Sequence, residues 1–300
     1  MPSPDATVDL FEAQRPRLQR LAYRMLGSMA EAEDMVQDAW LRWQAADRAQ
    51  VREPAAYLTR IVTRLCLDAM TSARARRETY FGSWLPEPMV EPEDEDMRFD
   101  ELTLTLMLAL ERLSPLERAA FLLHDVFGVP LDEVATTLER DGAAVRQLAA
   151  RARKRVRDDR PRFKVAREEG DRIARAFFLA SSNGDMAALR ALLAQDVVIM
   201  SDGGGKAHAF PNAIAGLDRV LRLFAGLYRK LTRQPAVLIR PVWIDGLPGY
   251  VSRERDDALQ TTALDIRDGR IVAIYITRNP DKLVRIAGLA GTGAAVPPLH

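Results

Sequence analysis

The chain has 300 residues, of which 48% are hydrophobic and 28% charged, and its formal net charge is +1. This length predicts about two or three domains, and the composition is that of a folded protein rather than a disordered one. The longest apolar run, Ile271–Ile276, is far shorter than the roughly 18 residues that span a bilayer, and the first residues lack the pattern of a secretory signal. Cys66 is the only cysteine, which excludes an intrachain disulfide and a cysteine-rich zinc site. We therefore expect a cytoplasmic protein without a bound metal.

Charge is distributed unevenly along the chain. Residues 81–104 are acidic and contain several prolines with little periodicity, which is typical of a linker. The segment Arg146–Arg157, by contrast, carries basic side chains and no acidic one. Because the whole chain is nearly neutral, any nucleic-acid binding should come from such a local patch.

Residues 1–80 are predicted to form a helical domain. Ser28 and Glu31 have the spacing of a capping box, in which each side chain satisfies an unpaired backbone N–H of the first turn. The next residues place apolar side chains between Met35 and Trp43 at spacings of three and four, as on one face of a helix. Pro54 suits the first position of another helix, because its missing N–H would have no partner there.

Residues 105–160 are predicted to form a second helical domain with a helix-turn-helix. The sequence Ser114-Pro115-Leu116-Glu117 combines an N-cap, a proline at the first helical position and a glutamate at the third. A short helix over Leu131–Leu138, a break at Asp141-Gly142 and a longer basic helix are typical of the motif. On the second helix, the residue types suit the reading of base edges at Ala143, Ala144, Arg146 and Gln147, and phosphate binding at Arg151, Arg153, Lys154 and Arg155. The alternative is a basic helix that is merely solvated.

Residues 167–285 are predicted to form an α+β domain. Helices are expected around Asp171–Ala180, from Asn183-Gly184 to Leu193, and over Leu217–Leu231. Strands are expected at Val197–Met200, Val237–Ile244, Ala258–Ile266 and Ile271–Ile276, with a hairpin turn at Asp268-Gly269, where positive φ is needed. We expect the helices to cover one face of a curved antiparallel sheet. Residues 286–300 are expected to form a flexible tail.

Short motifs in the first two domains resemble those of a known family. Residues 22–28 (AYRMLGS) and 32–42 (AEDMVQDAWLR) resemble region 2 of sigma-70-type transcription initiation factors, and residues 145–153 (VRQLAARAR) resemble region 4. No further sigma domain lies between these two regions. The chain is therefore similar to the extracytoplasmic-function (ECF) type of sigma factor.

Three more motifs resemble a subgroup of ECF sigma factors with a C-terminal SnoaL-like extension. They lie at residues 84–88 (WLPEP), 202–206 (DGGGK) and 279–283 (NPDKL). The resemblance implies a multidomain fold with two all-α sigma domains and an α+β SnoaL-like cone domain. Its parts would be region 2, a helical bundle, at 1–80; the acidic linker at 81–104; region 4, a helix-turn-helix, at 105–160; and the SnoaL-like domain at 167–285.

The resemblance also implies a function that is not enzymatic. A sigma factor binds core RNA polymerase and directs recognition of the −10 promoter element by region 2 and of the −35 element by region 4. The implied polymerase contacts are the flap region and a coiled coil of the largest subunit, the latter through Asp34, Gln37 and Asp38. Unstacked −10 DNA would meet residues among Tyr57, Thr59, Arg60, Thr63 and Arg64, with a specificity loop near Thr71–Arg77. The acidic linker would thread through the nucleic-acid channel of the enzyme, and neither a membrane nor a cofactor is implied.

In the same subgroup, the C-terminal domain is expected to regulate the sigma regions in cis, as a separate anti-sigma protein does elsewhere. Trp84 and Leu85 are large apolar residues in an otherwise acidic linker, and their burial against another domain would stabilise a docked state. The residues expected at this intramolecular contact are Trp84, Leu85, Pro86, Asp202, Lys206, Asn279, Pro280 and Asp281.

Two other functions remain open on the sequence. SnoaL-like folds include enzymes that use Asp or His as acid and base, and the candidates here are Asp202, His208, Arg253 and Arg278, lined by Trp243, Tyr250 and Tyr275. A lone His is more often structural, and an Asp that heads a glycine turn commonly caps the backbone, so we expect no catalytic residue. The second alternative is a DNA-binding regulator that senses a small ligand. It would need the helix-turn-helix but not the acidic face at Asp34.

Overall fold

The computed structural model describes residues 4–47, 50–78, 80–91, 103–157, 165–230 and 235–290. The chain divides into two compact units. One, here called the helical unit, consists of Met1–Thr79 and Leu106–Arg160; the other, the sheet unit, consists of Tyr80–Thr105 and Pro161–His300. The segment expected to be a linker, residues 81–104, thus belongs to the sheet unit. None of the helices in the described ranges is long and apolar enough to cross a membrane.

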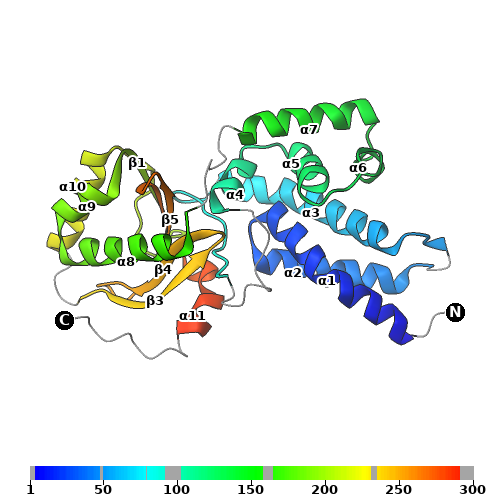
Figure 1. The fold of residues 1–300 in the computed structure, drawn as a ribbon. Coiled ribbons are helices and arrows are strands. Elements are labelled where there is room, and N and C mark those ends of the chain that lie inside the picture. The colour runs from blue at the N-terminus through cyan, green and yellow to red at the C-terminus, as the bar shows by residue number, and fades with distance from the viewer. Residues whose placement is uncertain are drawn as a thin grey trace. The chain divides into compact units, whose positions relative to one another are not determined.

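The first part of the helical unit is a bundle of three helices: α1 (Pro4–Leu26), α2 (Met29–Ala45) and α3 (Pro54–Glu78) (Figure 1). As predicted, Ser28 caps α2, and its hydroxyl accepts a hydrogen bond from the backbone N–H of Glu31 at 3.4 Å. Pro54 is the first residue of α3. The bundle buries apolar side chains of all three helices, among them Phe11, Leu21, Val36, Trp43, Leu58 and Val62.

The second part of the helical unit contains the predicted helix-turn-helix. Its helices are α4 (Leu104–Glu111), α5 (Pro115–Phe121), a π-helical turn (Leu122–Val126), α6 (Leu131–Leu138) and α7 (Gly142–Arg157). Ser114 and Glu117 form both halves of a capping box at the start of α5. Helix α6 is followed by its C-cap residue, Glu139, whose φ of 52° is left-handed. The Asp141 carboxylate then accepts a bond from the N–H of Ala144 at 2.8 Å, which starts α7.

Within the helical unit the two parts pack on each other, with α3 against α5 and α6. The guanidinium of Arg118 is the main polar link between them and is only 2% exposed. It donates to the backbone oxygen of Met25 at the end of α1 (2.7 Å), to that of Leu110 (2.9 Å) and to the Glu111 carboxylate (2.7 Å). A buried charge is tolerated because each bond replaces one to water.

The sheet unit is built on six strands in the order β2-β1-β6-β5-β4-β3. They are β1 (Leu193–Asp202), β2 (Ile214–Ala215), β3 (Val237–Ile244), β4 (Leu247–Arg253), β5 (Leu259–Arg267) and β6 (Arg270–Thr277). All neighbouring pairs are antiparallel except β1 and β6, which are parallel, with Asp202 opposite Thr277. The sheet is therefore mixed, not purely antiparallel as we expected. Strands β1 and β6 can run parallel because several helices and strands lie between them in the chain.

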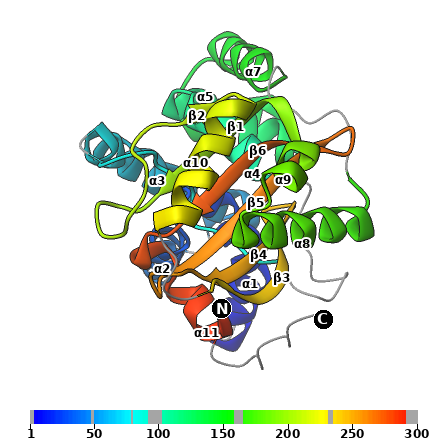
Figure 2. The ribbon, with the colours of Figure 1, turned by 90° about the vertical axis from the view of Figure 1, so that its left-hand side faces the viewer.

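Helices α8 (Arg167–Asn183), α9 (Met186–Leu192) and α10 (Leu217–Lys230) cover one face of this sheet, as Figure 2 shows. The helices contribute Ile173, Phe177 and Phe224 to the core between the two layers, and the strands contribute Leu264 and Ile274. The prediction that the helices pack on one face of the sheet is confirmed.

Strands β2 and β4 were not predicted. In β4, Pro248 and Gly249 lower the strand propensity, although Asp245-Gly246 before it is a hairpin turn with positive φ at both residues. Gly249 is required by packing, since a Cβ there would lie 2.0 Å from the backbone oxygen of Thr262 on β5. At the other end, α11 (Val284–Ala290) extends into the segment expected to be a tail, and Ile286 on it is buried.

Candidate functional site

The acidic face of α2 is formed as the sequence predicts. Asp34, Gln37 and Asp38 are exposed at positions i, i+3 and i+4, while Val36 and Ala39, which face the other side of the helix, are fully buried. Leu41, one turn further on the same face, is 54% exposed and was not among the predicted residues. This face presents carboxylates, an amide and one apolar side chain to a partner.

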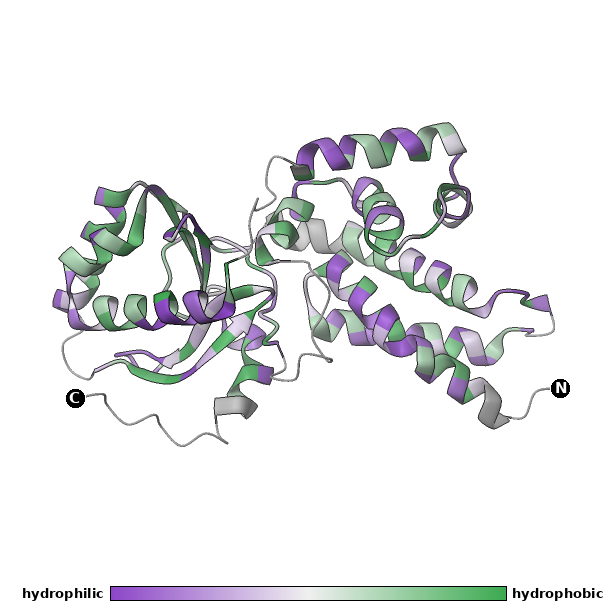
Figure 3. Cartoon of the chain, in the orientation of Figure 1, coloured by the Kyte–Doolittle hydropathy of each residue, from purple (hydrophilic) through white to green (hydrophobic). Residues whose placement is uncertain are grey.

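The candidate DNA-reading residues lie at the start of α7. Ala143, Arg146 and Gln147 are exposed and Ala144 is half-buried, whereas Val145 packs into the core. Figure 3 shows hydrophilic residues along the length of α7. The helix thus offers one arginine and one glutamine in the turn that a helix-turn-helix places against base edges.

The basic side chains further along α7 are mostly held by acids of the same unit. The Glu117 carboxylate accepts from Arg151 (3.0 Å) and Arg155 (2.7 Å), and Asp125 accepts from Arg153 (2.6 Å). Lys154 is exposed and makes no ion pair within the described residues. A phosphate at Arg151, Arg153 or Arg155 would compete with an existing partner, whereas one at Lys154 would not.

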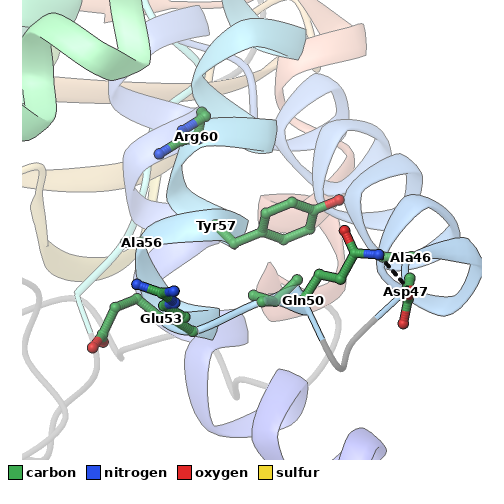
Figure 4. Close-up of a pocket in the computed structure, with 9 residues that line it drawn as sticks. Ala46, Asp47, Gln50, Glu53, Ala56, Tyr57 and Arg60 are labelled. Carbon is green, nitrogen blue, oxygen red and sulfur yellow. Dashed lines mark hydrogen bonds between the residues drawn. The ribbon is translucent and has the colours of Figure 1, made fainter.

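A pocket of about 550 Å³ lies between the end of α2 and the start of α3. Tyr57 and Arg60, two of the predicted −10 residues, line it together with the segment that joins the helices (Figure 4). The Tyr57 ring rests on Trp43, with 5.9 Å between the ring centroids. The complete described lining is Ala46, Asp47, Gln50, Val51, Arg52, Glu53, Ala56, Tyr57 and Arg60.

The other predicted −10 residues of α3 lie outside the pocket. Arg64 forms an ion pair with Glu139 at 2.6 Å, just after α6. Thr59 and Thr63 are buried, and their hydroxyls donate to backbone oxygens one turn earlier. The expected loop near Thr71–Arg77 is wrong, because these residues continue α3 as far as Glu78; the side chains from Ser72 onward are outside the described part. The non-helical connection in this part of the chain lies earlier, between α2 and α3.

In the sheet unit, Asp202 is the centre of a buried polar cluster that holds the linker. The residue is fully buried at the end of β1. Its Oδ1 accepts from the Tyr80 hydroxyl (2.6 Å) and the N–H of Gly204 (3.1 Å), and its Oδ2 accepts from the N–H of Leu85 (2.9 Å) and from Lys282 (2.7 Å). Both oxygens therefore have two donors each, which uses the bonding capacity of a carboxylate. Of these four donors, Leu85 belongs to the linker and Tyr80 directly precedes it.

The three motifs found in the sequence meet at this cluster. Asn279 donates its side-chain N–H to the Tyr80 hydroxyl at 2.8 Å. The Lys282 ammonium also donates to the backbone oxygen of Leu85 and lies 4.4 Å from the centre of the Trp84 ring. Gly204 is required here, since a Cβ would fall 2.3 Å from the Asn279 amide. Burial of the Tyr80 phenol raises its pKa, and its hydrogen bond to Asp202 adds to this effect. The phenol therefore keeps its proton and donates it in a hydrogen bond to the Asp202 carboxylate.

The remaining predicted residues of this contact lie around the cluster. Leu85 is 1% exposed and Pro86 is buried beside it. Lys206 and Asp281 form an exposed ion pair at 2.6 Å, and Pro280 is exposed. These last three therefore contact the linker less directly than Asp202, Asn279 and Lys282.

A second stretch of the linker pairs with the edge strand β3. The N–H of Glu91 donates to the Trp243 oxygen (2.8 Å), and the N–H of Asp245 donates to the Met89 oxygen (2.9 Å). The Asp245 carboxylate accepts in turn from the N–H of Met89 at 3.2 Å. The Glu91 side chain also forms an ion pair with Arg167 on α8. Linker residues 89–91 thus extend the sheet at its exposed edge.

The residues of the enzymatic alternative are not brought together. Asp202 is occupied by the linker, His208 is exposed, and Arg253 pairs with Asp257 at 3.4 Å on the surface. Arg278 is bonded to both carboxylate oxygens of Asp256. Tyr250 is packed against Phe178, with ring centroids 5.3 Å apart.

Several residues at these sites were missed by the sequence reasoning. Asp47 and Gln50 lie in a short polar connection with no periodic signal. Lys282 belongs to the NPDKL motif but was not selected, and Tyr80 lies just before the linker motif. The available signal was a lysine in the NPDKL motif together with an indole in the WLPEP motif, because a cation stacks favourably on an indole ring.

Comparison with known proteins gives the family of the chain. The family model "Sigma-70 region 2" matches residues 10–76, and "Sigma-70, region 4" matches residues 103–156. The chain is 40% identical over 300 residues to the ECF RNA polymerase sigma factor SigJ of Mycobacterium tuberculosis, covering 92% of each chain. It is 32% identical over 294 residues to the probable ECF RNA polymerase sigma factor SigI of the same organism, covering 94% of this chain and 97% of that one. In structure it is similar to the crystal structure of M. tuberculosis SigJ, with a TM-score of 0.73, 36% identity, and coverage of 92% of this chain and 98% of that chain.

The fold and these matches define a two-region transcription initiation factor with an α+β extension. The chain belongs to the ECF sigma factor family. It is a sigma factor that binds core RNA polymerase and directs promoter recognition through regions 2 and 4, and this family is not in general enzymatic.

Proposed function

We propose that the sheet unit regulates this sigma factor in cis by holding the linker that joins regions 2 and 4. The observation that carries the proposal is the fully buried Asp202 carboxylate, which accepts from Leu85 of the linker and from Tyr80 directly before it. Removing the linker would leave a buried charge with fewer donors, at a cost of about 1–3 kcal/mol for each lost bond. The bound linker is therefore the stable state of the free protein.

The bound linker limits how far regions 2 and 4 can separate. A free segment of about 25 residues could extend to roughly 80 Å, but residues 80–91 are fixed on the sheet unit at two places, the Asp202 cluster and the edge of β3. In addition, the contacts of Arg118 with Met25 and of Arg64 with Glu139 join the two regions directly. Binding to polymerase and promoter requires that these contacts open, because Arg64 is needed at the −10 DNA.

In the open state we assign each contact of the sigma regions to one site. The face of Asp34, Gln37 and Asp38 binds the coiled coil of the polymerase's largest subunit, and region 4 binds the flap region. The pocket between α2 and α3 takes one unstacked base of the −10 element, because it combines an aromatic ring, Tyr57, with a cation, Arg60. The start of α7, at Arg146 and Gln147, reads the −35 element.

The cis regulation is tested with Tyr80→Phe in the full chain. This change removes only the hydroxyl that joins the linker to Asp202 and Asn279. We expect thermolysin to cleave the Met89–Val90 bond faster, because both residues are half-buried in the bound linker, and transcription with core polymerase to rise several-fold. Tyr228→Phe is the matched control, since Tyr228 is an exposed tyrosine on α10 of the same unit.

If cleavage and transcription in Tyr80→Phe equal those of Tyr228→Phe, the linker contact does not regulate the factor. Faster cleavage with unchanged transcription would also contradict the proposal, because release of the linker would then have no effect on activity.

A further inference from the structure

Strand β3 lies at the edge of the sheet, where only one of its two sides faces a neighbouring strand, β4. Pro241 has no N–H to donate, which hinders pairing on the outer side of the first half of β3. In the second half, the backbone oxygen of Trp243 and the N–H of Asp245 bond linker residues 89–91. An edge strand with such groups is a template for pairing with an extended chain, and when the linker leaves this template is exposed.

The edge binds the linker chiefly through backbone groups. The N–H of Glu91 and the oxygen of Met89 bond β3 itself, and the N–H of Met89 donates to the Asp245 carboxylate at 3.2 Å. Any extended segment can make these bonds, because every residue except proline carries both an N–H and a C=O group. Backbone pairing of this kind supplies affinity, whereas the choice of sequence comes from the side chains beside it.

An arginine held on an indole ring selects an acidic side chain at this edge. Arg167, the first residue of α8, forms an ion pair with Glu91 of the linker. Its guanidinium carbon lies 4.5 Å from the centre of the Trp243 ring, and the Trp243 N–H is fixed in turn by a 2.8 Å hydrogen bond to Asp171. The cation is therefore placed in advance for a carboxylate in the position of Glu91.

A second arginine selects an acid four residues earlier in the bound segment. Arg285 on α11 forms an ion pair with Glu87 at 3.5 Å. With the linker in place, the side chains of Arg167 and Arg285 are still 37% and 45% exposed, so both can be reached from solvent. The site thus combines sequence-independent backbone bonds with a requirement for two acids, one in the position of Glu87 and one in that of Glu91.

We propose that the edge of β3, with Arg167 and Arg285 beside it, is a docking site for an extended acidic segment of another protein, which takes the place of the linker. The inference rests on the proposed release of the linker, because both segments use the same bonds. Tethering gives the linker a local concentration of roughly millimolar. The foreign segment therefore binds the closed protein weakly and binds well once the linker is released, which keeps the sigma regions free.

The probe is a labelled peptide with the sequence of residues 86–91, PEPMVE, capped at both ends. Its binding to the full chain is followed by fluorescence anisotropy. In one receptor chain, Glu87→Lys and Glu91→Lys make the two arginines repel its own linker. We expect this chain to bind the peptide about tenfold more tightly than the wild type does, because the linker no longer competes. Adding Arg167→Glu should abolish that binding, and adding Arg172→Glu, an exposed arginine of α8 that pairs with Glu169, is the matched control.

A second receptor chain reverses the charges of the site instead of those of the linker. With Arg167→Glu and Arg285→Glu, the chain should bind the peptide PKPMVK about tenfold more tightly than PEPMVE. A peptide of the original composition in another order, MEEPVP, has the same charge but cannot place its acids four residues apart. We expect it to bind neither receptor chain.

The proposal is overturned if PEPMVE does not bind the first receptor chain, if MEEPVP binds it equally well, or if the charge reversal does not exchange the preferred peptide. The proposed cis regulation is tested separately, by transcription from the wild type at saturating PEPMVE, which should rise as the linker is displaced. Binding in the expected pattern without that rise would support the docking site and contradict the cis regulation. Absence of binding together with higher transcription in Tyr80→Phe would overturn the docking site alone.

Discussion

Asp34 and Asp38 are single residues whose role follows from exposure and spacing. Their carboxylates share one face of α2 and are not used by the fold, since the residues between them supply the core contacts. Replacing both by alanine should leave the helix intact and weaken binding to core polymerase about tenfold per residue, because charge-assisted hydrogen bonds contribute about 1–3 kcal/mol each. Binding is measured by titrating labelled protein with core enzyme.

Asp68→Ala is the control for this double variant, since Asp68 is an exposed acid on α3 of the same bundle. The assignment of the α2 face is wrong if the double variant and the control bind core enzyme equally well.

Arg146 and Lys154 differ in what they can contribute to promoter binding. Arg146 is exposed in the first turns of α7, where a guanidinium can bond a base edge, so Arg146→Ala should relax preference at one −35 position by about 1–3 kcal/mol. Lys154 lies two turns further on with no ion-pair partner in the described part of the chain, so Lys154→Ala should weaken all sequences alike and flatten the salt dependence. Competition binding with promoter variants at two salt concentrations separates the two effects. A uniform loss in both variants would remove Arg146 as a base-reading residue.

One buried side chain of α5, Glu117, forms two ion pairs with α7; it is 4% exposed and pairs with Arg151 and Arg155. Burial alone would raise the pKa of Glu117, but the bonds from Ser114 and Arg151 outweigh it, so the pKa lies below its ordinary value. A carboxyl with a depressed pKa in the folded state stabilises the fold above its unfolded pKa, and this stabilisation is lost as the pH falls through the folded value. Glu117→Gln keeps the cap and removes the charge. It should therefore lower the free energy of unfolding by about 1 kcal/mol at pH 7, since water screens the two half-exposed arginines, and by less below about pH 4.

This loss is measured as the shift of the urea midpoint followed by far-UV circular dichroism, at pH 7 and at pH 4. Glu139→Gln should change the midpoint less, because its pair with Arg64 is more exposed. A loss in Glu117→Gln that is equal at both pH values would mean that its ion pairs do not stabilise α7.

Some of the helices and strands could be predicted from the sequence, and others could not. Helices α2, α3 and α5 were predicted because caps and an N-terminal proline act on residues within one turn. Strand β4 was missed because Pro248 and Gly249 disfavour strands locally, while long-range pairing with β3 and β5 overrides them. Two residues that line the pocket, Tyr57 and Arg60, were expected as DNA contacts because they lie on a periodic helix, whereas Gln50 and Asp47 lie in a connection without a periodic pattern.

At the scale of the whole molecule, the linker is the segment whose structure depends most on contacts with residues distant in the sequence. Its acidic, proline-rich composition predicts a solvated segment, and only Trp84 and Leu85 indicated docking. The partners that hold it, Asp202 and Lys282, are more than a hundred residues away. Such partners cannot be deduced from local patterns, although motifs of unusual composition at separate positions can mark them.

The C-terminal residues complete the linker site, so their removal should release it. Truncation before Asn279 deletes Asn279 and Lys282 but leaves β6 intact, since this strand ends at Thr277. We expect higher transcription with core polymerase and larger dimensions in small-angle scattering, and Trp84→Ala in the full chain should loosen the protein in the same direction. An increase of about tenfold in transcription would correspond to about 1.4 kcal/mol of linker binding. Truncation after Ala290 is the matched control, because it keeps every linker contact that the structure describes. Unchanged dimensions together with unchanged transcription would mean that the extension regulates the sigma regions by another route, such as binding a ligand or a partner.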